Sequence, residues 1–281
     1  MIAKYLNFVF CVALTCAGVT TQAFAWQPAP GYTQIPIWPA GKMPDPLTDV
    51  KIESEKIITD PLVAGKPWTA IFDVSQPTIT VYSPKSKNTG AAIVVFPGGG
   101  FNGLAIDLEG TEICDWATTK GVTCVLLKYR VPDSGPAWHE DCQCHIKPIA
   151  PTALQDAQRT IGLIRANADK WNIDPKKVGV IGFSAGGFMV AQISSNFKQR
   201  AYAPIDDADK ESCRPDFAIA LYPGHMMAEN DSGKEIFELN KDVPFTKDSP
   251  QTFLLQAQND PIDSIDYSLL YYIGLKNVGV P

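Results

Sequence analysis

The ten residues Val178-Gly179-Val180-Ile181-Gly182-Phe183-Ser184-Ala185-Gly186-Gly187 decide the fold of this chain. The first four predict a buried strand, and the apolar residues from Phe188 onward are compatible with a helix. Between them lies the pattern G-x-S-x-G, in which a sharp strand-to-helix turn exposes a serine hydroxyl above a sheet. Glycines 182 and 186 permit so tight a turn because they carry no Cβ. Ser184 is therefore our candidate nucleophile, the alternative being a plain turn between buried elements.

Strand-like and helical patterns alternate along the rest of the chain. Helical patterns cover about 110–120, 152–171, a segment after 184, and 264–278. This alternation predicts an α/β fold with a doubly wound, mainly parallel sheet. Asp156 and Arg159, three residues apart on the second helix, are expected to form an ion pair. The expected strands, most of them continuously apolar as in sheets buried on both faces, are 78–82, 91–96, 122–127, 178–183, 217–222 and 252–257.

The N-terminus has the pattern of a secretory signal peptide. Lys4 precedes an apolar run over residues 5–19, and Ala23-Phe24-Ala25 fits the small-x-small cleavage rule. A membrane anchor is the alternative, but the apolar run is short for a span. We expect a periplasmic or secreted protein without membrane contact after cleavage. The expected organisation is a signal peptide at 1–25, a proline-rich arm at 26–70 and one α/β domain at 71–281.

The charge of the chain excludes some partners. The formal net charge is −6, which argues against binding to nucleic acid or to an anionic membrane. The pattern G-x-x-x-x-G-K-[ST] does not occur in the sequence, so this type of phosphate-binding glycine loop is not indicated. We expect no cofactor and no metal.

Five cysteines lie outside the expected signal peptide, an odd number that leaves at least one without an intramolecular partner. Cys114 in a helix and Cys124 in a strand are expected to be buried and to act as small apolar residues. The sequence does not assign disulfide pairs among the five. They are Cys114, Cys124, Cys142, Cys144 and Cys213.

The irregular segment 131–151 is a candidate pocket wall, because it leaves a strand on the face where Ser184 emerges. Trp138 in this segment could stack on a sugar or an aromatic acyl group, or simply pack locally. His139 and His145 flank Cys142 and Cys144, a grouping that zinc can use. Four ligands within seven residues are cramped, so we favour a pocket loop over a metal site.

A glycine-rich turn, Pro97-Gly98-Gly99-Gly100, follows the expected strand at 91–96. Acyl transfer by a serine needs N–H donors for the oxyanion that forms on the carbonyl. The N–H groups of Gly99 and Gly100, together with that of Ala185 after the nucleophile, are candidates for these donors. Glu109 is expected to support this turn or to cap the helix that follows.

The carboxylate that orients the catalytic base should follow a strand downstream of the nucleophile. Asn259-Asp260-Pro261 comes directly after the expected strand at 252–257, and Asp260 is our candidate. Asp263 is the alternative, although it could instead cap the last helix.

Six segments in this order resemble the exported esterase branch of the α/β-hydrolase superfamily, which includes acetyl-xylan, feruloyl and dienelactone-hydrolase-like enzymes. The resemblance covers residues 71–281 and implies hydrolysis of a small-molecule or polysaccharide ester, without a cofactor, through an acyl-enzyme. It implies Ser184 as nucleophile, Asp260 as acid, and Gly99, Gly100 and Ala185 around the oxyanion. The segments are FPGGGF, LKYRVP, LQDAQRTIGLIR, VGVIGFSAGG, CRPDFAIALYP and FLLQAQNDP.

One feature departs from the family pattern. The chain order in this fold is serine, acid, histidine, yet His139, His145 and His225 all precede Asp260. Relatives continue beyond the equivalent of Gly279-Val280-Pro281 with a strand and a loop that carries the histidine. We therefore expect a C-terminally incomplete hydrolase fold that lacks the last strand, the last helix and the general base. His225, which follows the expected strand at 217–222, is another candidate for the base; contact with the substrate and packing within its loop are the alternatives.

Two other function classes stay open at the level of sequence. One is a prolyl-oligopeptidase-like serine peptidase, which would need a further domain to select peptides. The other is a binding protein of hydrolase fold without catalysis, for which the missing histidine is the argument.

Overall fold

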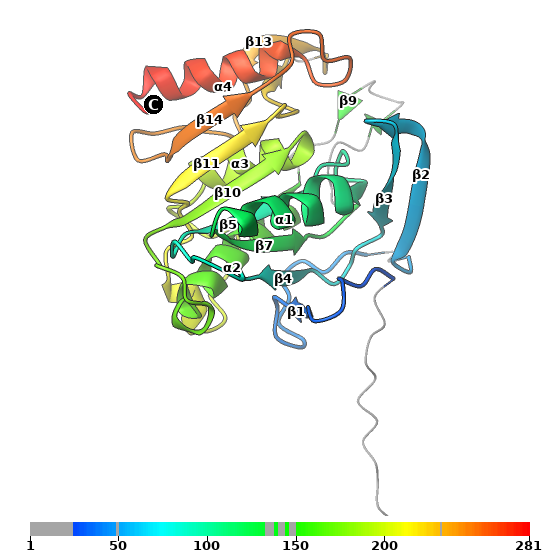
Figure 1. Ribbon diagram of the computed structural model, residues 1–281. Helices are drawn as coiled ribbons and strands as arrows, with labels where there is room; N and C mark the ends of the chain where they lie inside the picture. Colours follow the sequence, from blue (N-terminus) through cyan, green and yellow to red (C-terminus); the bar gives the residue numbers. More distant parts are fainter. Residues whose placement is uncertain (1–24, 49–50, 133–137, 140–143, 146–149, 231) are drawn as a thin grey trace, which may run out of the picture.

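A computed structural model describes residues 25–281 except 49–50, 133–137, 140–143, 146–149 and 231. Its centre is a seven-stranded sheet (Figure 1) in which β7, β5, β10, β11 and β14 run parallel; at one edge β4 pairs antiparallel with β7, and β1 pairs antiparallel with β4. This sheet confirms the expected α/β fold class. Its strands, in spatial order, are β1 (Gln34–Pro36), β4 (Thr78–Tyr82), β7 (Thr123–Lys128), β5 (Ala92–Phe96), β10 (Val178–Phe183), β11 (Phe217–Leu221) and β14 (Gln251–Leu255).

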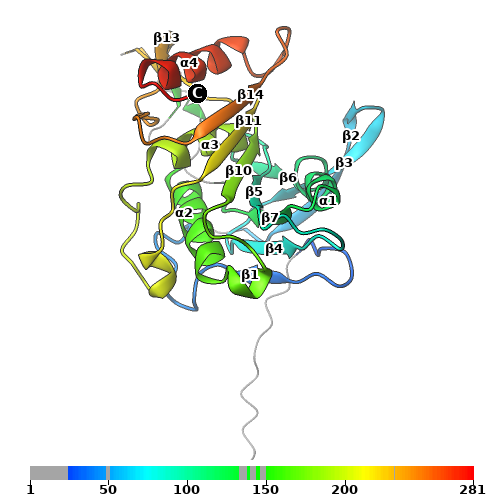
Figure 2. The ribbon, with the colours of Figure 1, turned by 60° about the vertical axis from the view of Figure 1, so that its left-hand side comes forward.

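Helices cover both faces of the sheet (Figure 2): α1 lies on one face, and α2 and α3 lie on the other. The central strands β5, β7 and β10 are buried along their whole length, as their continuously apolar sequences predict. None of the helices described here is long and apolar enough to cross a membrane. The helices are α1 (Glu112–Thr119), α2 (Pro151–Ala166), α3 (Ala185–Ser195) and α4 (Ile265–Asn277), with a π-helical turn at Asp107–Thr111 and 3₁₀ turns at Asp169–Trp171 and Asp207–Lys210.

Three small sheets surround the central one, and none of them was expected from the sequence. The hairpin of β2 (Ser54–Val63) and β3 (Lys66–Phe72) pairs with β6 (Gly103–Ala105). A second hairpin joins β12 (Met227–Glu229) to β13 (Glu235–Leu239). In the segment expected to form a pocket wall, β8 (Trp138–His139) pairs with β9 (Cys144–His145). The rest of that segment, including Cys142, lies outside the described residues, as do the side chains of β8 and β9.

The proline-rich arm is tied to the domain by a buried ion pair. Arg130, which follows β7, contacts Asp156 of α2 at 2.8 Å, and both side chains are fully buried. The indole N–H of Trp38 donates to the same carboxylate at 2.8 Å. Arg130 also donates to the carbonyl oxygens of Pro44 and Asp45. A single buried charge pair thus joins the arm, strand β7 and helix α2.

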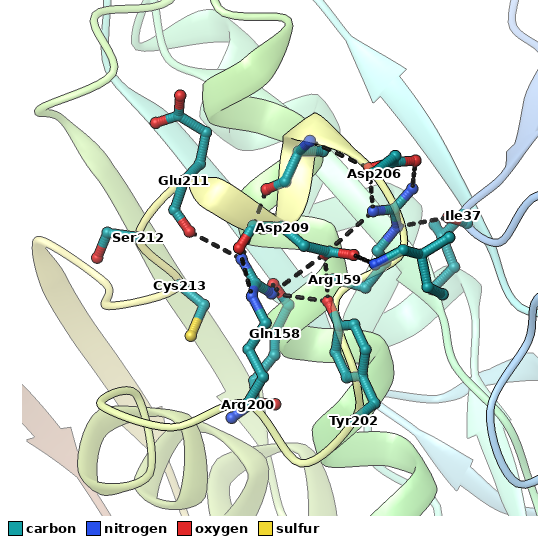
Figure 3. A network of polar contacts seen from close by, with 12 residues as sticks. Ile37, Gln158, Arg159, Arg200, Tyr202, Asp206, Asp209, Glu211, Ser212 and Cys213 are labelled. Carbon is teal, nitrogen blue, oxygen red and sulfur yellow. Dashed lines mark hydrogen bonds and ion pairs between the residues drawn. The ribbon is translucent and has the colours of Figure 1, made fainter.

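Asp156 and Arg159 do not pair with each other, so the expectation from their spacing was wrong. Arg159 instead contacts Asp206 at 2.6 Å and Asp209 at 3.0 Å, in the loop after α3 (Figure 3). Its Nε donates to the carbonyl of Ile37 in the arm. The two side chains reach different neighbours because buried charges take their partners from whatever packs against the helix, and both are buried.

The cysteines were predicted only in part. Cys114 of α1 and Cys124 of β7 are fully buried, as expected, but they form a disulfide and do not remain free thiols. Packing of α1 on β7 brings their Cα atoms within 5.1 Å, inside the range that a disulfide requires. Of the cysteines whose side chains are described, Cys213 is free and buried.

The Asp156–Arg130 pair yields a test of the scaffold. Asp156→Ala leaves a buried guanidinium without its carboxylate, so we expect the free energy of unfolding to fall by about 3–5 kcal/mol. Urea denaturation followed by circular dichroism measures this change. The control is Asp207→Ala, since Asp207 and Lys210 form an exposed pair. An unchanged unfolding midpoint in Asp156→Ala would contradict the anchoring role.

Candidate active site

Ser184 lies on a strained turn between β10 and α3. Its backbone has φ 51° and ψ −116°, a conformation that non-glycine residues adopt mainly where the surroundings enforce it. A Cβ on Gly182 would lie 2.1 Å from the carbonyl oxygen of Gly186, and a Cβ on Gly186 would lie 2.0 Å from that of Phe96. Only glycine fits at either position. The sequence predicted this turn, and the close approach of backbones explains its glycines.

A cavity of about 920 Å³ lies over Ser184, within the size range of small-molecule sites. It brings together seven of the residues singled out from sequence: Gly99, Gly100, Glu109, Ser184, His225, Asp260 and Asp263. The other described lining residues come mainly from the two small hairpins and from the loop before α4. They are Pro61, Val63, Trp68, Ala105, Leu108, Tyr222, Glu229, Gly233, Lys234, Glu235, Ile262 and Tyr267.

Two residues predicted for the site, Ala185 and Trp138, are not among the described residues that line the cavity. Ala185 is the first residue of α3, follows Ser184 in the chain and is fully buried. It therefore contributes to the site through its backbone and not through its side chain. Trp138 lies in β8, and the direction of its side chain falls outside the description. An aromatic wall is present elsewhere, because Trp68 of β3 and Tyr267 of α4 line the cavity. The sequence pointed to neither as a site residue: β3 was not predicted as a strand, and nothing distinguished Tyr267 within the helix predicted at 264–278.

Backbone N–H groups near Ser184 are available to a ligand. Within the described chain, no acceptor is found for the N–H of Gly99 or Gly100. The N–H of Ala185 is likewise without an acceptor there, as expected for the first turn of a helix. Positive backbone angles at Gly99 (φ 135°) and Gly100 (φ 61°) shape this turn, which a side chain at either position would disfavour.

Two carboxylates of the loop before α4 lie at the cavity with different partners. One oxygen of Asp260 accepts hydrogen bonds from the N–H groups of Ile262 at 2.9 Å and Asp263 at 3.0 Å. The carboxylate of Asp263 hydrogen-bonds the Ser184 side chain. Burial raises the pKa of Asp263, with a smaller contribution from the charge of Asp260, while the bond to Ser184 acts in the opposite direction. Asp260, the candidate from sequence, therefore fixes the backbone that carries Asp263.

His225 lies beside the nucleophile turn. The N–H of Gly224 donates to the carbonyl of Ser184 at 3.0 Å, which places His225 next to this strand end. Its ring packs 5.8 Å from Phe101 and 5.7 Å from Phe188, centroid to centroid. No group of three or more His, Cys, Asp or Glu side chains suited to a metal occurs among the residues described.

Comparison with known proteins agrees with this architecture. A family model described as the alpha/beta hydrolase fold matches residues 93–277. The chain therefore belongs to the α/β hydrolase fold family.

Sequence relatives of this chain include xylan-related proteins. An acetylxylan esterase from Xylanibacter ruminicola is 33% identical over 164 residues, covering 58% of this chain and 28% of that protein. An endo-1,4-β-xylanase B from Butyrivibrio fibrisolvens is 26% identical over 204 residues, covering 67% of this chain and 30% of that protein. The chain thus spans under a third of the length of these two relatives.

A solved structure also resembles this chain over most of its length. It is an acetyl ester-xyloside bifunctional hydrolase from Caldicellulosiruptor lactoaceticus, with a TM-score of 0.61, 27% identity, and coverage of 89% of this chain and 83% of that one. An esterase from Thermogutta terrifontis, with a TM-score of 0.57, 20% identity, and coverage of 73% of this chain and 74% of that one, shares the fold.

The raised pKa of Asp263 yields a test by pH. The folded protein holds this proton to a higher pH than the unfolded chain, so Asp263 reduces the free energy of unfolding as pH rises from about 4 through its folded pKa. Asp263→Asn removes this loss. We expect the variant to gain stability over wild type between pH 3 and pH 8, by about 1.4 kcal/mol for each unit by which the pKa is raised. Urea denaturation at both pH values measures the difference, and a gain independent of pH would contradict the assignment.

Proposed function

We propose that this protein is a serine esterase that removes small acyl groups, acetyl above all, from carbohydrate esters, and that it acts in the periplasm or outside the cell. The observation that carries the proposal is the position of Ser184 on its strained turn, beside three backbone N–H groups without described acceptors. The names of two relatives, an acetylxylan esterase and an acetyl ester-xyloside hydrolase, support the choice of substrate. The signal-peptide pattern at 1–25 supports export.

In the proposed reaction, Ser184 Oγ attacks the acyl carbonyl and transfers its proton to a general base. The carbonyl oxygen becomes an oxyanion that accepts hydrogen bonds from the N–H groups of Gly99, Gly100 and Ala185. The sugar hydroxyl leaves with the proton, and water then hydrolyses the acyl-enzyme. Because donors fixed by the backbone need little rearrangement, they stabilise the transition state more than the bound ester.

Asp260 is the carboxylate that we propose to orient the base. Its hydrogen bonds from two backbone N–H groups hold one oxygen in place, and the other oxygen accepts only a long hydrogen bond, 3.5 Å, from the Gln256 side chain, which a histidine at the cavity could replace. Such a carboxylate holds a histidine in the tautomer that accepts the serine proton.

We further propose that the base is a histidine that follows the acid, in the order serine, acid, histidine that this fold uses. His139, His145 and His225 all precede Asp260 in the sequence, so none of them fits that order.

Added imidazole tests the nucleophile and the base together. We expect the chain to release p-nitrophenol from p-nitrophenyl acetate slowly, since the oxyanion donors and binding alone leave about 10³–10⁴-fold catalysis over water. Imidazole should raise this rate at least about tenfold, in a saturable manner, because it supplies a proton acceptor for the Ser184 hydroxyl.

Two variants serve as controls for this experiment. Ser184→Ala should show only the reaction of imidazole with the ester in solution, and the Ser184-dependent rate is the difference between wild type and this variant. His225→Ala should keep the imidazole-stimulated rate within about threefold. A Ser184→Ala variant as fast as wild type would overturn the proposal. Loss of all activity without imidazole in His225→Ala would make His225 the base.

A further inference from the structure

The turn that carries Gly99 and Gly100 is fixed at its carbonyl groups. The Tyr129 hydroxyl donates to the carbonyl of Pro97. The carbonyl of Gly98 accepts from Ala105 N–H at 3.0 Å, and the carbonyl of Gly99 accepts from the N–H of residues 102 and 103 at 3.1 Å. These bonds set the orientation of successive peptide groups. The N–H of Gly98 belongs to the same peptide group as the Pro97 carbonyl, so a hydrogen bond to this N–H holds the start of the turn from its other side.

Glu109 holds that N–H group. Its Oε2 accepts from Gly98 N–H at 2.6 Å, and its Oε1 accepts from the Tyr222 hydroxyl at 2.9 Å. Glu109 belongs to the π-helical turn before α1, whereas Tyr222 follows β11. The carboxylate thus bridges the glycine turn to the end of a strand on the other side of β10. Both side chains line the cavity with Ser184.

The packing around Gly98 leaves no room for a side chain. A Cβ on Gly98 would lie 2.7 Å from Glu109 Oε2, 2.6 Å from the carbonyl oxygen of Phe183 and 3.2 Å from Ser184 Cβ. Glu109, the turn and the nucleophile therefore meet around one glycine. Burial raises the pKa of Glu109, while its bonds from Tyr222 and Gly98 lower it. Two hydrogen bonds offset part of the free energy that burial of a carboxyl group costs.

We propose that Glu109 is a positioning residue of the oxyanion hole: with Tyr222 it fixes the Gly98 peptide so that the N–H groups of Gly99 and Gly100 face the cavity at Ser184. The inference rests on the proposed function, because it assigns those N–H groups to the oxyanion. A negative charge close to a forming oxyanion opposes it. Glu109 therefore acts through its geometry as a hydrogen-bond acceptor, and its charge is not required.

Substitution at Glu109 separates geometry from charge. Glu109→Ala removes the acceptor, so we expect kcat for p-nitrophenyl acetate, measured as the Ser184-dependent rate with imidazole present, to fall on the order of 10²-fold, with KM changed less than about twofold. Glu109→Gln keeps an amide oxygen that accepts from Gly98, so kcat should stay within about fivefold of wild type. Glu112→Gln, an exposed carboxylate at the start of α1, is the matched control.

Amide hydrogen exchange tests the same inference without a measurement of catalytic activity. In Glu109→Ala the peptide containing residues 97–103 should exchange at least about tenfold faster than in wild type, while peptides from β10 and α3 stay unchanged. Tyr222→Phe removes the second anchor and serves if Glu109→Ala unfolds. We expect a smaller increase in exchange over the same peptide, and no additional increase when both substitutions are combined.

Unchanged exchange at residues 97–103 in both Glu109→Ala and Tyr222→Phe overturns the inference, whatever the activity. A Glu109→Gln variant as inactive as Glu109→Ala also overturns it, because the charge would then be required. Ser184→Ala as active as wild type defeats the proposed function separately, since it leaves the exchange result in place.

Discussion

The left-handed backbone at Ser184 is enforced by the close approach of three chain segments. The carbonyl of Gly186 would lie within 2.1 Å of any Cβ at residue 182, and the carbonyl of Phe96 would lie within 2.0 Å of any Cβ at residue 186. The end of β5, the end of β10 and the start of α3 therefore meet with only backbone between them. This contact places the glycine turn after β5 next to the serine and leaves the Ala185 N–H at the same point. The roles that we assign to the Asp260 loop and to the Glu109 bridge depend on this position of the serine.

The scaffold keeps that contact in place through buried polar groups and not through apolar packing alone. The Arg130–Asp156 pair joins the arm to α2, and the Glu109 bridge joins the turn before α1 to the end of β11. Both place carboxylates where solvation is lost, which is unfavourable unless each oxygen is hydrogen-bonded. Such groups specify one arrangement of neighbouring elements, because a displaced element would leave a buried charge without a partner. Both the active site and the scaffold are therefore held by a buried carboxylate that accepts hydrogen bonds from two or more chain segments.

The sequence predicted the elements whose patterns are local. Continuous apolar runs gave the central strands, and the glycine spacing around Ser184 gave the turn, since both follow from the residues themselves. It did not predict what depends on contacts distant along the chain. Asp156 and Arg159 lie three apart, yet each pairs with a loop brought in by tertiary packing, and the Cys114–Cys124 pairing required α1 to lie on β7. The β2–β3 hairpin and its Trp68 were missed because an exposed hairpin carries a weak apolar pattern. Whether Asp260 orients the base stays a prediction, and Asp263 is the carboxylate that meets Ser184 in the described chain.

The central claim is that Ser184 is the nucleophile, activated by its position beside the oxyanion donors. Covalent labelling with a fluorophosphonate tests it most directly, because the reagent mimics the tetrahedral intermediate and stays on the residue that attacks it. After incubation with imidazole and digestion, mass spectrometry should locate a single adduct on Ser184. An adduct on another residue, or no adduct at all in the presence of imidazole, would contradict the account.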